Sequence, residues 1–237
     1  MAFNVQTFKT RALSALLFAV IMLAGLLWSF WTFTLLFIII HFGCWYEFIK
    51  LMNKIDKQNF LLRCCWGLIY ITLPVILLID LRAFGLNMNL PLKGNIYGLL
   101  LPLVIIGSMW VNDTMAYLVG SFIGKTPFSK ISPKKTWEGT IGGAILCIIV
   151  IGFAASLYTE YSFPFRNYDW FIIAALCAVF GTTGDLIESK IKRMANVKDS
   201  GNIMPGHGGF LDRFDSLLIA TPFVWLYVKL FVLQNFL

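Results

Sequence analysis

The sequence predicts an all-α polytopic integral membrane protein with about seven transmembrane helices, in a range of about six to nine. Hydrophobic residues make up 59% of the 237-residue chain and charged residues only 13%, a balance that soluble globular domains do not show. Several apolar runs approach or exceed the roughly 20 residues that a helix needs to cross a bilayer. In addition, Lys and Arg gather on alternate connections between these runs.

The apolar runs place the membrane spans along the chain. We expect spans near residues 12–28, 30–49, 64–80, 95–122, 139–158, 168–187 and 216–236. The first run is too long for the usual signal-peptide core of about 7–15 residues, and no clear small-residue cleavage site follows it. We therefore interpret it as a retained first span. The fourth run is long enough for one tilted or broken helix, or for two short ones.

The basic residues predict the orientation of these spans. If the spans alternate in direction, fifteen of the nineteen Lys and Arg residues fall on one side of the membrane. The other side holds only Arg82, Lys93 and Arg166, and Lys229 lies within the last span. Because basic residues concentrate on cytoplasmic connections, we expect a cytoplasmic N-terminus and a C-terminus outside.

The same bias accounts for most of the net charge of +7. Attraction to anionic lipid headgroups or to nucleotide phosphates is a second explanation that stays open. Nucleic-acid binding has no support, because no soluble basic domain is present. Without an internal repeat or a low-complexity segment, we expect residues 1–237 to form one membrane domain. The five Cys residues lie in or beside apolar runs and have no zinc-type spacing, so we interpret them as buried apolar residues.

The first polar motif interrupts the fourth apolar run with the sequence "MWVNDTMAYLVGSFIGK". It contains Asn112 and Asp113. A carboxylate at membrane depth costs about 2.5–3.5 kcal/mol on insertion scales, so it usually faces a partner or a wet cavity. An interfacial Asp at the end of a helix is the alternative.

The second polar motif, "SKISPKKTWEGTIGG", covers residues 129–143 and leads into the fifth span. Lys134 and Lys135 are either ordinary cytoplasmic lysines or ligands of phosphate oxygens. Gly139 and Gly143 form a small-xxx-small pair, for which helix packing is the ordinary role.

The third polar motif begins with "GDLIESKIKR" at the end of the sixth span. Asp185, Glu188, Ser189 and Lys192 are spaced i, i+3, i+4 and i+7, which places them on one face of a helix. A solvated helix end explains the later residues. It does not explain Asp185, which lies two turns back toward the apolar run.

The motif continues through "PGHGG" into "LDRFDS" at the start of the seventh span. Asp212 and Asp215 lie one helical turn apart and repel each other unless a cation lies between them. Carboxylate oxygens are ligands that suit Mg²⁺. The glycine-rich turn lets the backbone approach a ligand, and its N–H groups can hold phosphate. Together these features predict a metal–polyphosphate site at the membrane surface.

The stretch from Ser189 to Ser216 reads "S-x-x-K-R … K-D-S-G … P-G-H-G-G-x-x-D-R-x-D-S". This pattern resembles the signature of the phosphatidate cytidylyltransferases, or CDP-diacylglycerol synthases. The blocks "NDTMAYLVGSFIGK" and "ISPKKTWEG" are similar to other recurring blocks of that family, in the same order. The resemblance covers roughly residues 100–220, the expected catalytic core, whereas residues 1–100 match only as hydrophobic spans.

The resemblance implies that CTP and phosphatidic acid react to CDP-diacylglycerol and pyrophosphate, with Mg²⁺. Whether one or two metal ions bind is left open. It also implies an inner-membrane protein whose site faces the cytoplasm. The lipid phosphate attacks the α-phosphorus of CTP, so the developing charge needs metal and cationic stabilisation more than a covalent nucleophile. CTP, phosphatidic acid and the bilayer are the expected partners, and a homodimer is left open.

The resemblance and the motifs together give the expected site residues. The expected catalytic residues are Asp185, Ser189, Lys192, Arg193, Lys198, Asp199, His207, Asp212, Arg213 and Asp215. The expected substrate-binding residues are Asn112, Asp113, Lys134, Lys135, Thr136, Gly206, Gly208, Gly209 and Ser216. The expected metal ligands are Asp185, Asp212, Asp215 and Asp113. A purely structural role for His207 in its turn is an equal alternative.

Two other classes of function are compatible with parts of the sequence. A CDP-archaeol synthase or a CTP-dependent polyprenol or phytol kinase would also combine a cytidine nucleotide with a lipid, but the form of the glycine-rich motif favours phosphatidate. A transporter would also carry intramembrane carboxylates. Against a transporter, no inverted repeat is present, and the polar residues gather on one face instead of at the midplane.

Overall fold

The structure, a computed structural model, describes residues 5–87, 95–129, 131–159, 164–203 and 208–234. Of residues 5–13, 84–87 and 95–97 it describes the backbone only. Within these ranges the fold is all-α, as predicted, and the only β-type pairing in them is an isolated bridge between Pro127 and Thr136.

The helices follow the predicted spans. In chain order they are α1 (Val5–Leu27), α2 (Phe30–Ile55), α3 (Phe60–Gly67), the π-helical turn η1 (Leu68–Thr72), α4 (Leu73–Asn87), α5 (Asn95–Ile123), α6 (Trp137–Ser156), α7 (Asn167–Met194), α8 (Leu211–Tyr227) and the π-helical turn η4 (Val228–Val232). Six helical segments of the described chain are long and apolar enough to cross a membrane, and the described apolar part of α1, Ser14–Leu27, is shorter.

Several boundaries differ from the prediction. The third span is a continuous helical segment from 60 to 83 that combines α3, η1 and most of α4. The fourth is one helix, α5, with Pro102 inside it. The polar face predicted beyond residue 187 remains helical, because α7 continues to Met194.

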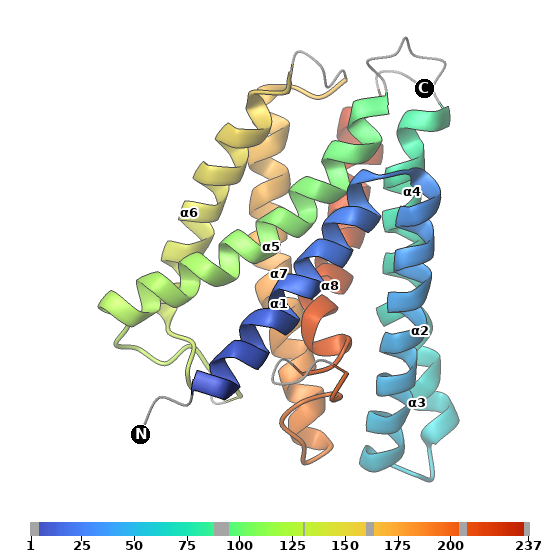
Figure 1. The fold of residues 1–237 in the computed structure, drawn as a ribbon, viewed down its shortest axis with the longest axis vertical. Coiled ribbons are helices and arrows are strands. Elements are labelled where there is room, and N and C mark those ends of the chain that lie inside the picture. The colour runs from blue at the N-terminus through green and yellow to red at the C-terminus, as the bar shows by residue number, and fades with distance from the viewer. Residues whose placement is uncertain (1–4, 88–94, 130, 160–163, 204–207, 235–237) are drawn as a thin grey trace.

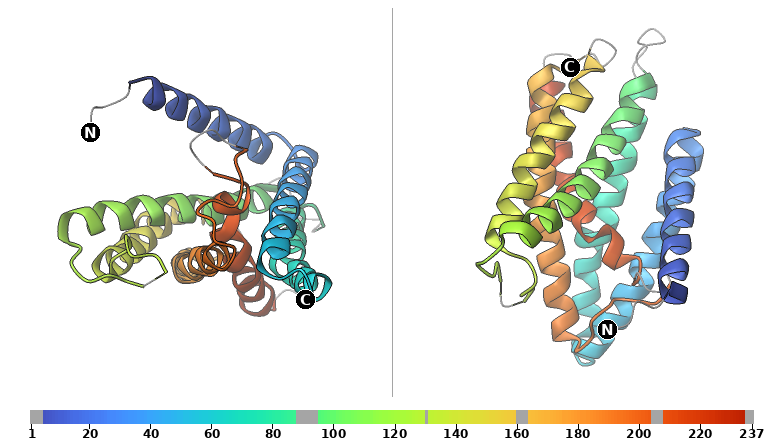
Figure 2. Two further views of the ribbon diagram at one scale, coloured as in Figure 1. Left: turned by 90° about the horizontal axis from the view of Figure 1, so that it is seen from below. Right: turned by 60° about the vertical axis from the view of Figure 1, so that its left-hand side comes forward.

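Successive long helices alternate in direction, and α5 crosses the bundle obliquely (Figure 1). One end of the bundle holds the connection 56–59, the described parts of the loop between α5 and α6, and the residues that directly follow α7. We call this the polar end. From there α8 and η4 run toward the opposite end. Viewed from the polar end, α7 and α8 lie between the α5–α6 pair and the group of α2, α3 and α4 (Figure 2, left).

The α2–α3 connection at the polar end is organised by Asp56. Its carboxylate accepts hydrogen bonds from the Asn59 side chain (3.0 Å) and from the backbone N–H of Gln58 (2.9 Å), and it pairs with Arg63 (3.1 Å). These bonds favour the charged form of Asp56 and lower its pKa to about 2. The hydrogen bond from the Asn59 side chain has the largest effect. This charged turn separates the end of α2 from the start of α3 at the polar end.

The distribution of apolar side chains suits a bilayer. Phe33, Phe37, Ile105 and Trp170 have no exposed surface and form part of the core between the helices. Large apolar side chains on the outer faces remain exposed, such as Phe122 at 84%. A soluble protein would bury such a surface, whereas lipid tails cover it at no hydrophobic cost.

Two helix crossings are close because glycine lies at the contact. A Cβ atom on Gly143 of α6 would lie 2.6 Å from the Ala116 Cα of α5, and one on Gly139 would lie 2.7 Å from the Ala116 carbonyl oxygen. On α7, a Cβ on Gly184 would lie 2.5 Å from the Asp215 carbonyl oxygen of α8. These contacts agree with the packing role expected of the small-xxx-small pair. They also bring the polar ends of α5, α6, α7 and α8 together.

Candidate functional site

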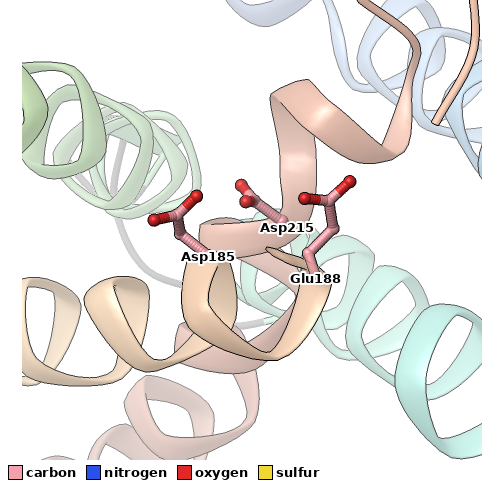
Figure 3. A group of neighbouring side chains, drawn as sticks. All are labelled: Asp185, Glu188 and Asp215. Atoms are coloured by element: carbon pink, nitrogen blue, oxygen red, sulfur yellow. The ribbon is translucent and has the colours of Figure 1, made fainter. Parts of the chain in front are cut away.

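Three carboxylates meet where α7 and α8 cross. Asp185 and Glu188 lie one turn apart on α7, and Asp215 faces them from α8 (Figure 3). One carboxylate oxygen from each lies within 4.8 Å of the others. Glu188 is 1% exposed and Asp215 is 7% exposed, while Asp185 is partly exposed. The glycine contact at position 184 permits this approach, because it brings the backbone of Asp215 against α7.

Two lysine side chains pair with the cluster and offset only part of its negative charge. Lys135 forms an ion pair with Asp185, and Lys192 forms one with Glu188. Oε1 of Glu188 is buried and has no hydrogen-bond partner among the described residues. Three clustered oxygen donors with one such unpartnered atom form a donor set that fits a hard divalent cation such as Mg²⁺.

A cavity of about 390 Å³ opens beside the cluster. Its lining comes from α5, the loop before α6, α6, α7 and α8, which are the elements that the two glycine crossings draw together. The cavity brings together nine of the predicted site residues: Asn112, Asp113, Lys134, Lys135, Thr136, Asp185, Asp212, Asp215 and Ser216.

The loop before α6 holds the two lysines at the cavity. Thr136 caps α6 by accepting the N–H of Gly139 at 3.1 Å. Glu138, in the first turn, accepts the Thr126 hydroxyl at 2.8 Å and so ties the start of the loop to its end. Between these two points the chain turns at the polar end, and Lys135 reaches Asp185 across the cavity.

Asp212 lines the cavity but is held by protein donors. Its Oδ1 accepts Lys192 Nζ at 2.6 Å, and its Oδ2 accepts the N–H groups of Ser200 and Gly209, each at 2.8 Å. Lys192 therefore bridges Asp212 and Glu188. In the structure Asp212 fixes the loop between α7 and α8, while its assignment as a metal ligand stays a prediction.

Asn112 lies at the inner wall of the cavity and is 4% exposed. Its Nδ2 donates to Thr182 Oγ1 at 3.4 Å, while its Oδ1 has no hydrogen-bond partner among the described residues. Asp113, the next residue of α5, also lines the cavity. Both residues therefore line the cavity, while their contacts with substrate stay a prediction.

Other predicted residues lie around the cavity. Within the described part of the chain, its lining does not include Ser189, Lys192, Arg193, Lys198, Asp199, Gly208, Gly209 or Arg213. Gly208 has a φ of +82°, a backbone conformation that favours glycine. The N–H of Gly209 donates a hydrogen bond to Asp212. Gly206 and His207 lie outside the described residues.

Sequence reasoning missed two carboxylates of this region. Glu188 was placed on the polar face of its helix but not among the metal ligands, although its i+3 spacing from Asp185 was the available signal. Glu47 was not singled out at all. It is an acidic residue inside the apolar run of α2, is 2% exposed, and contacts the chain between α7 and α8.

Comparison with known proteins gives consistent matches. Residues 75–231 match the cytidylyltransferase family. The chain is similar to the phosphatidate cytidylyltransferase of Rickettsia bellii, with 35% identity over 223 residues that cover 91% of this chain and 88% of that protein. A phosphatidate cytidylyltransferase of Bacillus subtilis is 43% identical over 52% of this chain and 45% of its own length.

A plant protein shows the same likeness over a similar region. The chloroplastic phosphatidate cytidylyltransferase 4 of Arabidopsis thaliana is 41% identical over 56% of this chain and 33% of its own length. The chain thus spans less than half of the length of the Bacillus and Arabidopsis relatives, and nearly all of the Rickettsia protein.

Proposed function

The chain belongs to the cytidylyltransferase family, and on this premise we propose that it transfers the CMP moiety of CTP to phosphatidic acid, giving CDP-diacylglycerol and pyrophosphate for phospholipid synthesis. The observation that carries the proposal is the cavity at the polar end, which is lined by Asp185 and Asp215 of the carboxylate cluster and by Lys134 and Lys135. A soluble nucleotide can enter there from water, while a lipid headgroup can reach it from the surrounding bilayer.

For the metal, we propose that Asp185, Glu188 and Asp215 hold Mg²⁺, with Asp113 and Asp212 beside them on the cavity wall. Bound there, Mg²⁺ supplies charge neutralisation at the phosphate oxygens of CTP. The cluster itself contributes the negative charge that draws a cation between two membrane helices. A second cation is a further expectation.

Lys134 and Lys135 are the proposed triphosphate ligands on the facing wall. Lys135 is paired with Asp185, so phosphate oxygens that arrive there exchange one anionic partner for another. Lys192 pairs with both Asp212 and Glu188 and so supplies positive charge beside the cluster. Because these groups orient and neutralise, the reaction needs no covalent nucleophile from the protein.

We also propose that the protein lies in the cytoplasmic membrane with its polar end toward the cytoplasm. The support is the excess of Lys and Arg on the connections at that end. The orientation matters for function, because CTP is a cytoplasmic nucleotide and cannot cross the bilayer.

The direct test is an assay of the purified protein in detergent with CTP, phosphatidic acid and Mg²⁺. We expect CDP-diacylglycerol to form only when all three are present. Replacing phosphatidic acid by an ether-linked analogue or by a polyprenol tests the two lipid alternatives in the same assay. A folded protein that makes no CDP-diacylglycerol with any divalent cation would show the proposal to be wrong.

A further inference from the structure

Glu47 is a buried carboxylate that the proposed chemistry does not use. It lies on α2 among buried apolar residues such as Cys44 and Phe48, and only 2% of its surface is exposed. An ionised group in such a place needs partners, because desolvating it is costly. Its described partners all belong to the chain between α7 and the start of α8, more than 150 residues away in sequence.

The carboxylate caps α8 from outside that helix. Oε1 accepts the N–H of Phe210 at 2.9 Å, and Oε2 accepts the N–H of Leu211 at 3.0 Å. The first N–H groups of a helix have no intrahelical acceptor, and its N-terminal end favours negative charge. Glu47 therefore accepts hydrogen bonds from the first N–H groups of α8, as an N-cap side chain normally does.

The loop closes tightly around the same carboxylate. Oε2 of Glu47 also accepts the Ser200 hydroxyl at 2.7 Å. Gly201 and Gly209 pass so close to Glu47 that a Cβ atom on either would overlap its carboxylate. Two of the glycines in this polar segment are thus required by the contact with α2.

Contacts lead from Glu47 directly to the candidate site. The Ser200 hydroxyl lies 2.9 Å from Oδ2 of Asp212, so its single proton serves either Glu47 or Asp212 at one time. Asp212 in turn binds Lys192, which pairs with Glu188 of the carboxylate cluster. A displacement of Ser200 or of the first turn of α8 would therefore move Asp212. Because Asp212 binds Lys192, this movement would also disturb the ion pair between Lys192 and Glu188.

We propose that Glu47 is a positioning residue: it fixes the loop before α8 so that Asp212 meets Lys192 and the cluster keeps the geometry that binds metal. The inference deepens the proposed function and rests on it. It gives the N-terminal part of the chain, outside the matched residues 75–231, a role in shaping the site through these contacts.

The test compares Glu47→Gln with Asp169→Asn. The amide keeps the size of Glu47 but replaces one acceptor oxygen by a donor, so at least one backbone N–H of the loop loses its partner. Asp169 is a matched control because it is 4% exposed, joins α7 to Tyr227 through a hydrogen bond of 2.5 Å, and lies at the opposite end of α7 from the cluster.

Two readouts separate positioning from general stability. We expect Glu47→Gln to raise the Mg²⁺ concentration for half-maximal turnover by about 10-fold to 100-fold, the usual effect of losing a partner that orients metal ligands. In hydrogen–deuterium exchange without CTP or metal, the amides of Ser200, Gly209 and Leu211 should exchange faster. Asp169→Asn should change neither the Mg²⁺ requirement nor the exchange of these amides.

The outcomes are distinct. Wild-type protein that makes no CDP-diacylglycerol overturns the proposed function. If the wild type is active and Glu47→Gln is unchanged in either readout, the positioning role alone is overturned. The same holds if both variants shift equally. If Glu47→Gln does not fold, Ser200→Ala removes only the hydroxyl that links Glu47 to Asp212. An unchanged Mg²⁺ requirement in that variant would then overturn the inference, and a raised one would support it.

Discussion

At the scale of single residues, the fold places negative charges where they are costly. Glu188 and Asp215 are almost fully buried, and one oxygen of each lies within 4.8 Å of an oxygen of Asp185. Repulsion between these groups destabilises the folded protein, and the two paired lysines offset only part of it. Clustered carboxylates that destabilise the free protein are expected where a bound cation neutralises them.

Asp215→Asn should therefore separate stability from activity. The substitution keeps the shape of the side chain and removes one of the repelling charges, so thermal unfolding without metal should occur at the same or a higher temperature. Turnover at saturating Mg²⁺ should fall by at least about 100-fold, the lower range for losing a group that stabilises the transition state. Thermal unfolding and the product assay measure the two effects.

Asp80→Asn is the matched control for this experiment. Asp80 on α4 binds Trp225 at 2.7 Å and Lys229 at 2.8 Å, away from the cavity. Its loss should lower the unfolding temperature and leave turnover near that of the wild type. If Asp215→Asn behaves in the same way, Asp215 is a structural residue and the case for the cluster as a metal site weakens.

At the scale of elements, the site depends on how closely α7 and α8 approach. The apolar runs predicted these helices, and the i, i+3, i+4 and i+7 spacing predicted the polar face that carries Asp185 and Glu188. The crossing itself was not predicted, because it depends on which residue of α8 meets Gly184. The π-helical turns η1 and η4 were also missed, since a local change in winding has no marker in an apolar run.

Gly184→Ala should damage the site by moving a helix. The added Cβ would lie 2.5 Å from the backbone oxygen of Asp215, so α7 and α8 must separate. Such overpacking costs about 1–3 kcal/mol, and it shifts Asp215 relative to Asp185 and Glu188. We expect a lower unfolding temperature and a loss of turnover together.

Gly107→Ala tests whether glycine replacement alone has this effect. Apart from the chain neighbours and the backbone of its own helix, the nearest described atom to a Cβ at Gly107 is Ile151 Cδ1 at 3.6 Å, an ordinary van der Waals contact. Since Ala favours helix over Gly by about 1 kcal/mol, this variant should be as stable as the wild type or more so, and fully active. Equal behaviour of the two variants would contradict the importance of the α7–α8 crossing.

At the scale of the whole molecule, segments far apart in sequence form one polar end. The order of the polar motifs and the bias of Lys and Arg predicted this gathering, because alternating spans bring alternate connections to one side. The contribution of α2 could not be predicted in the same way. Glu47 acquires its role through contacts with residues 200–211, and no pattern near residue 47 records them.

The shared polar end predicts the labelling of two exposed positions. Cysteines introduced at Asn53 and Asn202 should react with an impermeant reagent from the same face of sealed vesicles. Both side chains are exposed, at the end of α2 and in the loop after α7. The exposed native Cys65 is first replaced by Ser to lower the background. Labelling from opposite faces would contradict the arrangement of the helices.

The central claim is that the cavity between the carboxylate cluster and the two lysines transfers the nucleotidyl group of CTP to a lipid phosphate. The most direct test follows radioactive phosphorus from CTP labelled at either the α- or the γ-position, with phosphatidic acid and Mg²⁺. The account predicts that the α-label enters the lipid product and that the γ-label leaves as pyrophosphate. Transfer of the γ-label to lipid, with release of CDP, would reveal a kinase and contradict the account.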